Sequence, residues 1–556
     1  MKFLRMVREE SAISLPRLVA VATLAGISNA LVLAVINMAA EQTFKGTVSS
    51  WLLALFLGVV TLYTLTQRYV MLTTAQEMDR ILHKIRLRIT GKVRRADLRS
   101  FENIGHTEIY RGIHKDTTII SESSMSVVDG AQSALLVFFT VLYIGWLSLT
   151  AFVLTVTFVC LALLLYFQRR KHLRDSISQA AVKEKQLMDA LTDLLNGFKS
   201  VRINSLRSED LFAHINELSS DATHLNLRMR ANVTGQFIFA QMSFFLLMAA
   251  MVFVVPRFSL TYTDVVVQTI TAILFLMSPV GSLVGAIPTF ASANAAAERI
   301  SALEGRLDVA LHLPPETEHR RTAFREIRME GVTFHYESPE GQGGPAFGIG
   351  PIELTLRPGE VVFIAGGNGA GKSTLLKLLT GLYSPTHGVV RLDGVPVTEA
   401  NQSAFHNLFT PIFSDFHVFR RLYGIRLSQT EQVDELLQQM ELEEKTRLEG
   451  DEFETLELST GQRKRLALVV GCLEDKPILV LDEWAADQDP RFRRKFYEEV
   501  LPRLRQQGKT VVAVTHDDRY FGMADRLLTM CEGSLLEFHA IESDPKAPSM
   551  PEEHSS

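Results

Sequence analysis

Apolar and polar positions are distributed unevenly along the chain. Up to about residue 300, long apolar runs alternate with charged stretches, whereas the remainder has the composition of an ordinary soluble domain. Helices need about 20 apolar residues to cross a bilayer. Six runs of this kind predict six membrane-spanning helices, at residues 18–40, 51–70, 130–147, 149–167, 233–255 and 265–287.

Basic residues gather in alternate connections between these runs. They precede the first run (Lys2, Arg5, Arg8, Arg17) and fill the second-to-third connection (Arg80, Lys84, Arg86, Arg88, Lys92, Arg94, Arg95) and the fourth-to-fifth (Arg169, Arg170, Lys171, Arg174, Lys183, Lys185). The opposite connections hold little beyond Lys45 and Arg257. By the positive-inside rule, both long connections and the C-terminal half are expected in the cytoplasm.

Two other interpretations of the apolar runs are weaker. A cleaved signal peptide would have a core of about 7 to 15 residues, shorter than the first run, and five more runs follow. Helices buried in a large soluble protein would not explain the charge asymmetry.

The runs carry no ionisable residue at mid-depth, so coupling of transport to protons is disfavoured. Their amides either join helices or contact a transported molecule: Asn29, Asn37, Gln236 and Gln241.

A phosphate-binding loop motif opens the second half. Residues 366–373, GGNGAGKS, fit G-x-x-x-x-G-K-[ST] between an apolar strand-like run and a helix-like one. Glycines let backbone N–H groups surround phosphate oxygens, Lys372 reaches the β and γ phosphates, and Ser373 can hold Mg²⁺. The motif predicts nucleoside triphosphate contacts from Gly366, Asn368, Gly369, Gly371, Lys372, Ser373 and Thr374.

Composition excludes other classes of protein. The formal net charge of -5 and the pI near 6.3 give no indication of nucleic-acid binding. Membrane topology explains where the basic residues lie. The 3 cysteines and 15 histidines form no metal-ligand spacing.

The expected organisation is a membrane domain with six helices and two long cytoplasmic loops (1–303), a linker (304–324), a second domain (325–543) and a disordered tail (544–556). Segments 101–116 and 210–225 either dock on the second domain or are solvated connectors.

Further motifs carry a family resemblance. Four motifs follow the phosphate loop. They are, in order, residues 458–462 (LSTGQ, here called the signature), the strand-like 478–481 with Asp482 and Glu483 after it, then Asp489, and last 511–515 with His516 after it. The order resembles the ATP-binding cassette ATPases, and the six runs resemble a half-transporter of the type IV exporter fold. The implied fold class is a membrane α-helical domain plus an α/β P-loop nucleotide-binding domain.

The resemblance implies a role for each matching residue. Asp482 and Ser373 would hold Mg²⁺, and Glu483 would polarise the attacking water. Lys372 and His516 would complete the catalytic group, His516 by sensing the γ-phosphate. Ser459 and Gly461 would complete the ATP site of a second subunit. Further ATP contacts are implied for Gln462, Asp489 and Tyr336, the last by stacking on adenine. A packed strand tyrosine and an ordinary strand-end carboxylate pair are the alternatives for Tyr336 and for Asp482 with Glu483.

Three stretches are similar to the cyclic-peptide export branch of this family: 366–372, 413–419 (FSDFHVF) and 482–494 (DEWAADQDPRFRR). This branch includes exporters of pyoverdine-type siderophore precursors, syringomycin-type lipopeptides and microcin J25. The chain differs from most ATP-binding cassette ATPases at two places. The signature, residues 458–462, has Thr460, and residues 414–415 are Ser414-Asp415 where a glutamine is usual. Whether Ser414 is a magnesium ligand stays open.

The resemblance implies a homodimeric, ATP-driven exporter of a cyclic or non-ribosomal peptide, such as a siderophore precursor. It would lie among the lipids of a bacterial cytoplasmic (inner) membrane and move its cargo to the periplasm. Lipid or multidrug export is the alternative within transport. A cassette ATPase that regulates a partner and an ATP-gated channel are alternatives of other classes.

Overall fold

The structure, a computed structural model, describes residues 2–11, 15–44, 50–258, 266–309, 323–336, 347–425 and 431–539. The chain divides into two units, the first made of residues 1–90 and 107–305, and the second of 91–106 and 306–556. Residues 91–106 therefore belong with the C-terminal half, although they lie inside the expected membrane domain. The expected disordered tail lies outside the described residues.

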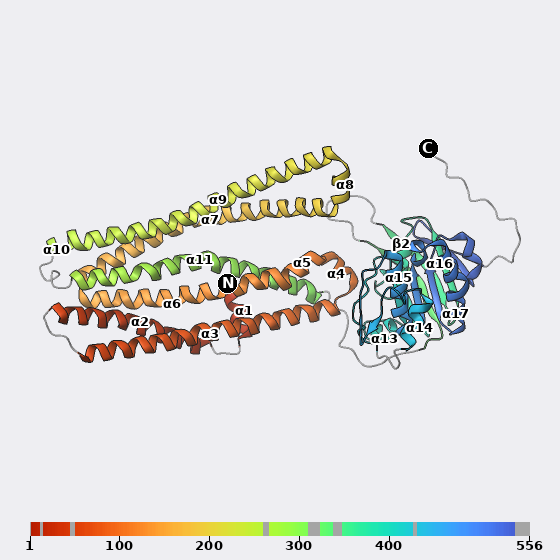
Figure 1. The fold of residues 1–556 in the computed structure, drawn as a ribbon, viewed down its shortest axis with the longest axis horizontal. Helices are drawn as coiled ribbons and strands as arrows, with labels where there is room; N and C mark the ends of the chain where they lie inside the picture. Colours follow the sequence, from red (N-terminus) through yellow and green to blue (C-terminus); the bar gives the residue numbers. More distant parts are fainter. Residues whose placement is uncertain are drawn as a thin grey trace. The chain divides into compact units, whose positions relative to one another are not determined.

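Long helices make up the first unit (Figure 1). Its helical elements are α1 (Lys2–Glu10), α2 (Leu15–Phe44), α3 (Ser50–Arg95), α5 (His106–Tyr110), η1 (Arg111–Asp116), α6 (Thr117–Leu147), α7 (Leu149–Asn196), α8 (Phe198–Ile203), α9 (Ser205–Ala249), η2 (Ala250–Val254), α10 (Val255–Phe258) and α11 (Val266–Val309). Among the described residues, four stretches are long and apolar enough to cross a membrane: Ala20–Gln42, Ser50–Arg95, His106–Leu147 and Val266–Val309. The other two expected spans lie on α7 and on the run of α9, η2 and α10, where the shorter apolar helical stretches are Leu149–Leu161 and Gln241–Val254.

One residue separates the third span from the fourth. Ser148 has an extended backbone (φ -157°, ψ 125°), its N–H donates to the carbonyl of Ile144, and its hydroxyl accepts from the N–H of Ala151. The same serine thus ends α6 and caps α7. A sharp reversal of the chain fits into a very short connection.

Apolar packing and polar contacts between helices, among them those of Asn37, hold the first unit together. Leu33, Ile144, Leu247 and Ile273 belong to one buried cluster, to which α2, α6, α7, α9, η2, α10 and α11 contribute. Asn37 Nδ2 donates to Tyr143 Oη at 3.2 Å and to the Gln268 carbonyl at 3.3 Å. Asn37 therefore joins α2, α6 and α11, which is the helix-joining role considered for the amides in the spans.

The second unit contains two larger sheets. The six-stranded sheet has the order β12-β11-β3-β10-β9-β6, and only its β11–β12 pair is antiparallel. A four-stranded antiparallel sheet has the order β2-β1-β4-β5. The strands are β1 (Ile327–His335), β2 (Gly348–Leu356), β3 (Val361–Gly366), β4 (His387–Leu392), β5 (Val395–Pro396), β6 (Phe409–Ile412), β7 (Leu448–Glu449), β8 (Glu452–Phe453), β9 (Ile478–Asp482), β10 (Thr510–Val514), β11 (Arg526–Cys531) and β12 (Ser534–His539).

Short helices cover these sheets. They are α4 (Leu98–Ile104), α12 (Lys372–Leu379), α13 (Gln402–His406), α14 (Glu431–Gln439), α15 (Thr460–Leu473), η4 (Trp484–Asp487), α16 (Pro490–Lys495), η5 (Phe496–Val500), α17 (Leu501–Gln506) and η6 (Asp518–Met523). Strands β3, β9 and β10 are buried almost throughout, as expected for central parallel strands with both faces covered. Helix α11 continues to Val309, into the segment expected as a linker, and Tyr336 lies just beyond the end of β1.

Candidate functional site

The order of the parallel strands brings the predicted site residues to one edge of the sheet. Strands β3, β10, β9 and β6 are successive neighbours. The phosphate loop follows β3, His516 follows β10, Glu483 follows β9, and Ser414 follows β6. Because the carboxyl ends of parallel strands share an edge, residues far apart in sequence meet there.

The phosphate loop has the conformation that its glycines predict. Gly371 has φ +104° directly before α12, and a Cβ there would lie 2.6 Å from Ile349 Cγ2. A Cβ at Gly366 would lie 2.3 Å from the Met530 carbonyl oxygen. Lys372 is buried, and its Nζ donates to the carbonyls of Gly366 at 2.9 Å and Gly367 at 3.0 Å. The ammonium therefore lies inside the curve of the loop.

Ser373 and Asp482 form a pair of oxygen donors. Ser373 Oγ donates to Asp482 Oδ2 at 2.9 Å. Burial raises the pKa of Asp482, although the hydrogen bond from Ser373 and one from the backbone N–H of Ser414 favour the charged form. Among the described residues, no three His, Cys, Asp or Glu side chains group as a metal site. One carboxylate with one hydroxyl still fits Mg²⁺, which keeps waters and takes phosphate oxygens as further ligands.

Glu483 stands between a cation and an imidazole. Its Oε1 lies 3.1 Å from His516 Nε2 and 3.8 Å from Lys372 Nζ. Its backbone is left-handed (φ 49°, ψ 36°), which is rare for a residue other than glycine and places it at a sharp turn after β9. The side chain is 37% exposed, so water can reach the carboxylate.

The signature residues form the start of α15. Ser459 caps this helix, its hydroxyl accepting from the N–H of Gln462 while the Gln462 side chain accepts from the N–H of Ser459. Ser459 is exposed, so the N-terminus of a 14-residue helix is open to an anion. Asp489, predicted to contact ATP, caps α16 and pairs with Arg465 at 2.7 Å.

Tyr336 lies beside the helix that follows the phosphate loop. Its Oη is 3.1 Å from Thr374 Oγ1, and its ring is near those of Phe347 and Tyr383. The structure therefore brings together all the predicted residues of the phosphate loop, the two carboxylates, His516 and Tyr336. Ser459 and Gly461 lie at the start of α15, and in the described part of the chain no hydrogen bond joins them to these residues.

Comparison with known proteins identifies the family. Residues 349–486 match the family "ABC transporter", and residues 18–282 match "ABC transporter transmembrane region". The chain is 32% identical over 531 residues to the ATP-binding protein SyrD of Pseudomonas syringae pv. syringae, with 92% of both proteins covered. The chain belongs to the ABC transporters.

More distant relatives agree with this family. An ATP-dependent lipid A-core flippase of Alkalilimnicola ehrlichii is 28% identical over 303 residues, covering 49% of each chain. A solved structure of a bacterial Atm1-family ABC exporter with ATP bound has a TM-score of 0.72 over 94% of both chains at 18% identity, which shows the exporter fold. The protein is thus a multi-pass half-transporter, and its ATPase domain binds ATP and couples hydrolysis to export.

This ABC transporter also has site residues that sequence reasoning missed. Glu102, on α4, accepts from Tyr383 Oη at 2.5 Å and from Lys377 Nζ at 2.9 Å. Lys377 lies on α12, and Tyr383 is beside Tyr336. Leu98 packs against the apolar core of the second unit, and Arg99 lies 5.4 Å from the ring centroid of Phe334. No local pattern marks Glu102, because its partners are more than 270 positions away.

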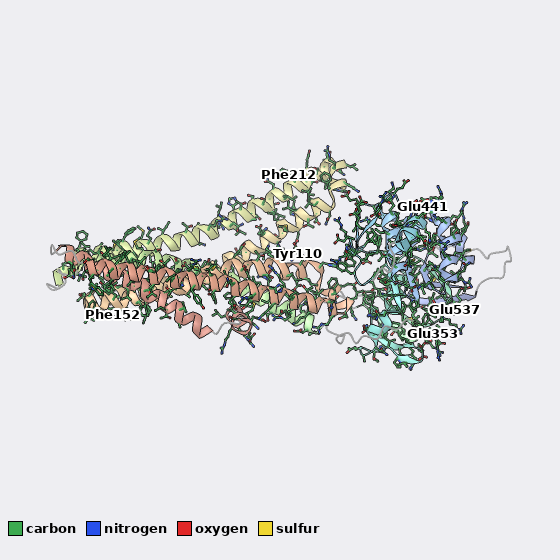
Figure 2. All side chains as sticks on the ribbon, turned by 60° about the horizontal axis from the view of Figure 1, so that its bottom comes forward. Tyr110, Phe152, Phe212, Glu353, Glu441 and Glu537 are labelled. Atoms are coloured by element: carbon green, nitrogen blue, oxygen red, sulfur yellow. The ribbon has the colours of Figure 1, made fainter. Side chains whose placement is uncertain are left out.

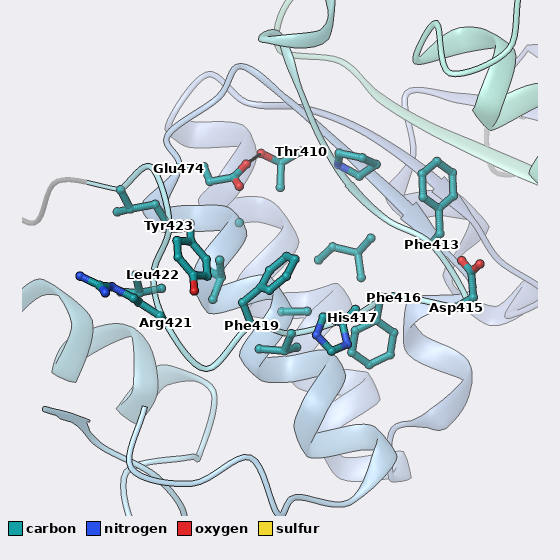
Figure 3. A pocket seen from close by; sticks show the side chains of 17 residues that line it. Thr410, Phe413, Asp415, Phe416, His417, Phe419, Arg421, Leu422, Tyr423 and Glu474 are labelled. Atoms are coloured by element: carbon teal, nitrogen blue, oxygen red, sulfur yellow. Dashed lines mark hydrogen bonds between the residues drawn. The ribbon is translucent and has the colours of Figure 1, made fainter. Parts of the chain in front are cut away.

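A groove lies next to the segment that follows β6, residues 413–425, which we call the Ser414 loop (Figure 3). Its cavity has a volume of about 400 Å³ and runs from β6 along the following loop to α15. Phe419 and Tyr423 line it and are 60% and 69% exposed. Asp415 and Glu474 add acidic groups to its lining. The loop that replaces the usual glutamine therefore touches Asp482 through the backbone of Ser414 and forms this groove with the residues after it.

Proposed function

We propose that this ABC transporter works as a homodimer that exports a cyclic or non-ribosomal peptide, such as a siderophore precursor, across a bacterial inner membrane to the periplasm. The observation that supports an active ATPase is the position of Glu483 at the phosphate-loop edge, within 4 Å of both Lys372 and His516. An ATP-gated channel that only binds nucleotide would not need this carboxylate.

Each catalytic residue has a role that its position supports. Lys372 binds the β and γ phosphates, Glu483 orients and polarises the attacking water, and His516 holds Glu483 and contacts the γ-phosphate. Ser373 and Asp482 hold Mg²⁺, which neutralises charge on the phosphates when bound. Phosphoryl transfer needs positioning and charge stabilisation more than covalent chemistry, and these groups supply both.

A second copy of the chain completes each ATP site. The exposed N-terminus of α15, with Ser459, Gly461 and Gln462, binds the γ-phosphate held by the partner's phosphate loop. Tyr336 stacks on the adenine of its own subunit. ATP thereby closes the two ATPase domains and turns the membrane domains outward, and hydrolysis resets them.

The groove of one copy receives α8 of the other. Helix α8 is the turn between α7 and α9, which run side by side in the first unit (Figure 1). It exposes Phe198 and Ile203, and Phe212 on α9 also faces outward (Figure 2). Its Lys199 and Arg202 complement Asp415 and Glu474 in the groove. The exposed aromatic rings and Asp415 of the groove thus match the apolar and basic groups on the helix, while Arg421, also in the lining, is paired with Asp451.

The resemblance to the cyclic-peptide export branch, which includes exporters of syringomycin-type lipopeptides, favours peptide cargo over lipid. SyrD matches 92% of this chain, whereas lipid A-core flippases match 49% to 63% of it. The stretches 413–419 and 482–494 carry the further resemblance to cyclic-peptide exporters.

The test is cargo-stimulated ATPase activity of the dimer in proteoliposomes, with cyclised peptides, lipid A and cationic dyes as candidates. We expect stimulation and ATP-dependent uptake into inside-out vesicles with cyclised peptides. Glu483→Gln serves as the transport-dead control. Stimulation by lipid A or dyes alone would replace the peptide assignment with lipid or multidrug export.

A further inference from the structure

Side chains attach the segment that follows Glu483 to α15. Lys464 is buried on α15, and its Nζ donates to the Glu483 carbonyl at 2.8 Å and pairs with Asp487 Oδ2 at 2.7 Å. In return, Trp484 Nε1 donates to the Lys464 carbonyl at 2.8 Å. A lysine near the start of the signature helix thus contacts the backbone of the residue that bears the candidate catalytic carboxylate.

A second set of contacts strengthens this attachment. Arg465 Nε donates to Gln488 Oε1 at 2.8 Å, and Gln488 Nε2 donates to the Gly461 carbonyl at 3.0 Å. A Cβ at Gly461 would lie 2.6 Å from the Asp487 carbonyl oxygen. The start of α15 and residues 483–489 therefore fit closely, and a displacement of one displaces the other.

Charge and conformation both indicate that Lys464 does more than fill space. A buried ammonium is costly unless it is paired, and Lys464 has one carboxylate and one carbonyl as partners. Glu483 has a strained left-handed backbone, which persists only where its surroundings hold it. Lys464 binds the carbonyl of that same residue.

We propose that Lys464 is a positioning residue that links the two ATP sites of the dimer. The proposal rests on the proposed function, in which α15 of one subunit contacts the partner's ATP while Glu483 of that subunit acts on its own. ATP in one site draws α15 toward it, and Lys464 transmits this displacement to the Glu483 that serves the other site. Filling one site thereby raises hydrolysis at the other.

The first test is Lys464→Met. Methionine keeps an unbranched apolar side chain out to the Cε position and removes the ammonium, and Asp487, 47% exposed, keeps its contact with water. Couplings between sites are typically about 5- to 150-fold. We expect hydrolysis per site to fall by a factor in this range, with ATP binding retained. Asp487→Asn, which keeps the buried lysine, should produce a loss in the same direction and serves if Lys464→Met does not fold.

The matched control is Lys509→Met. Lys509 Nζ likewise binds one carboxylate, Asp475 at 2.6 Å, and one carbonyl, Lys476 at 2.9 Å, but contacts neither Glu483 nor the start of α15. Its hydrolysis rate should match that of the wild type. An equal loss in both variants would mean that Lys464 has a general structural role, and would overturn the proposal.

Mixed dimers separate transmission from damage to the site. A dimer with one Lys372→Ala subunit has one competent site whose neighbour binds no ATP, so its rate should equal the rate per site of the Lys464→Met homodimer. Adding Lys464→Met to the competent subunit should then lower the rate no further. A further loss of the same factor as in the homodimer, or a wild-type rate for Lys464→Met, would overturn the link and leave the export function intact. A wild-type dimer that hydrolyses no ATP would instead overturn the proposed function, and the link with it.

Discussion

Glu483 is the residue whose assigned role is most sharply testable. Glu483→Gln keeps the shape of the side chain and the phosphate contacts but removes the charge that polarises water. We expect ATP binding at wild-type affinity and hydrolysis lower by about 100-fold or more, the usual contribution of a general base. Steady-state turnover in proteoliposomes and nucleotide binding by calorimetry measure the two effects. Turnover near the wild-type rate would remove Glu483 from this role.

If Asp482 holds Mg²⁺ as proposed, magnesium binding should depend on pH. Burial raises its pKa, so at a given acidic pH more of it is protonated than of an ordinary aspartate, and a proton competes with Mg²⁺. We expect apparent Mg²⁺ affinity to weaken as pH falls toward this raised pKa. Ser373→Ala removes a hydrogen bond to the charged form and should move the weakening to higher pH. Titrations of Mg²⁺-dependent ATP binding at several pH values measure this, and superimposable pH profiles for the two proteins would contradict it.

Local motifs predict the candidate catalytic residues, but not the side chains that support them. Lys372, Ser373 and Glu483 lie in short patterns whose chemistry depends on neighbours in sequence, and the structure places them at one sheet edge. Glu102 and Lys464 have no such pattern, since their roles depend on Tyr383 and Asp487 reaching them in the folded chain. Sequence reasoning finds residues that bind ligand more readily than residues that bind other residues.

Helix α4 is the element that the sequence only half predicted. By its sequence, segment 101–116 either docks on the ATPase half or is a solvated connector, and its first residues, 101–106, group with that half. The segment 210–225 lies within α9, whereas the turn of its loop is α8. Helical periodicity predicts the long helices α7 and α9, but it does not identify the short helix α8 that joins them as the segment available for docking.

Glu102 should couple α4 to the ATP site. Glu102→Gln weakens the bonds from Lys377 and Tyr383, which connect α4 to α12 and to the neighbour of Tyr336. We expect cargo stimulation of ATPase activity to fall several-fold, with basal hydrolysis little changed. Glu184→Gln, at an exposed carboxylate on α7, is the control. Full stimulation in Glu102→Gln would exclude this contact from coupling.

The Ser414 loop predicts a split between two variants. Phe419 is an exposed groove residue, so Phe419→Ala should lose cargo-stimulated ATPase and export while nucleotide binding stays normal. Ser414 contacts Asp482 through its backbone, so Ser414→Ala should leave basal hydrolysis largely intact. Magnesium titrations of both variants decide the matter. If Ser414→Ala abolishes Mg²⁺-dependent hydrolysis while Phe419→Ala stays coupled, the loop is a metal-site element.

For the whole molecule, the sequence predicted more about the composition of the parts than about their boundaries. Apolar length and charge asymmetry predicted membrane helices, because the bilayer imposes both requirements directly on sequence. They did not predict that residues 91–106 belong with the C-terminal half, or that α11 continues to Val309. A helix can pass from apolar to polar surroundings without a break. Composition therefore predicts which part of a helix lies in the bilayer, but not the residue at which the helix ends.

The proposed arrangement of ATP sites across two copies of the chain can be tested by combining two different mutant subunits in one dimer. Lys372→Ala removes the charge on the phosphates, and Ser459→Arg places a bulky cation at the start of α15. In a mixed dimer with one subunit of each kind, a trans arrangement puts both defects into one site and leaves the other site intact. Hydrolysis should therefore exceed that of either mutant homodimer, measured on dimers purified through two different tags. If each site instead used the phosphate loop and signature of one chain, both sites would be damaged, and activity would be no higher than in the homodimers.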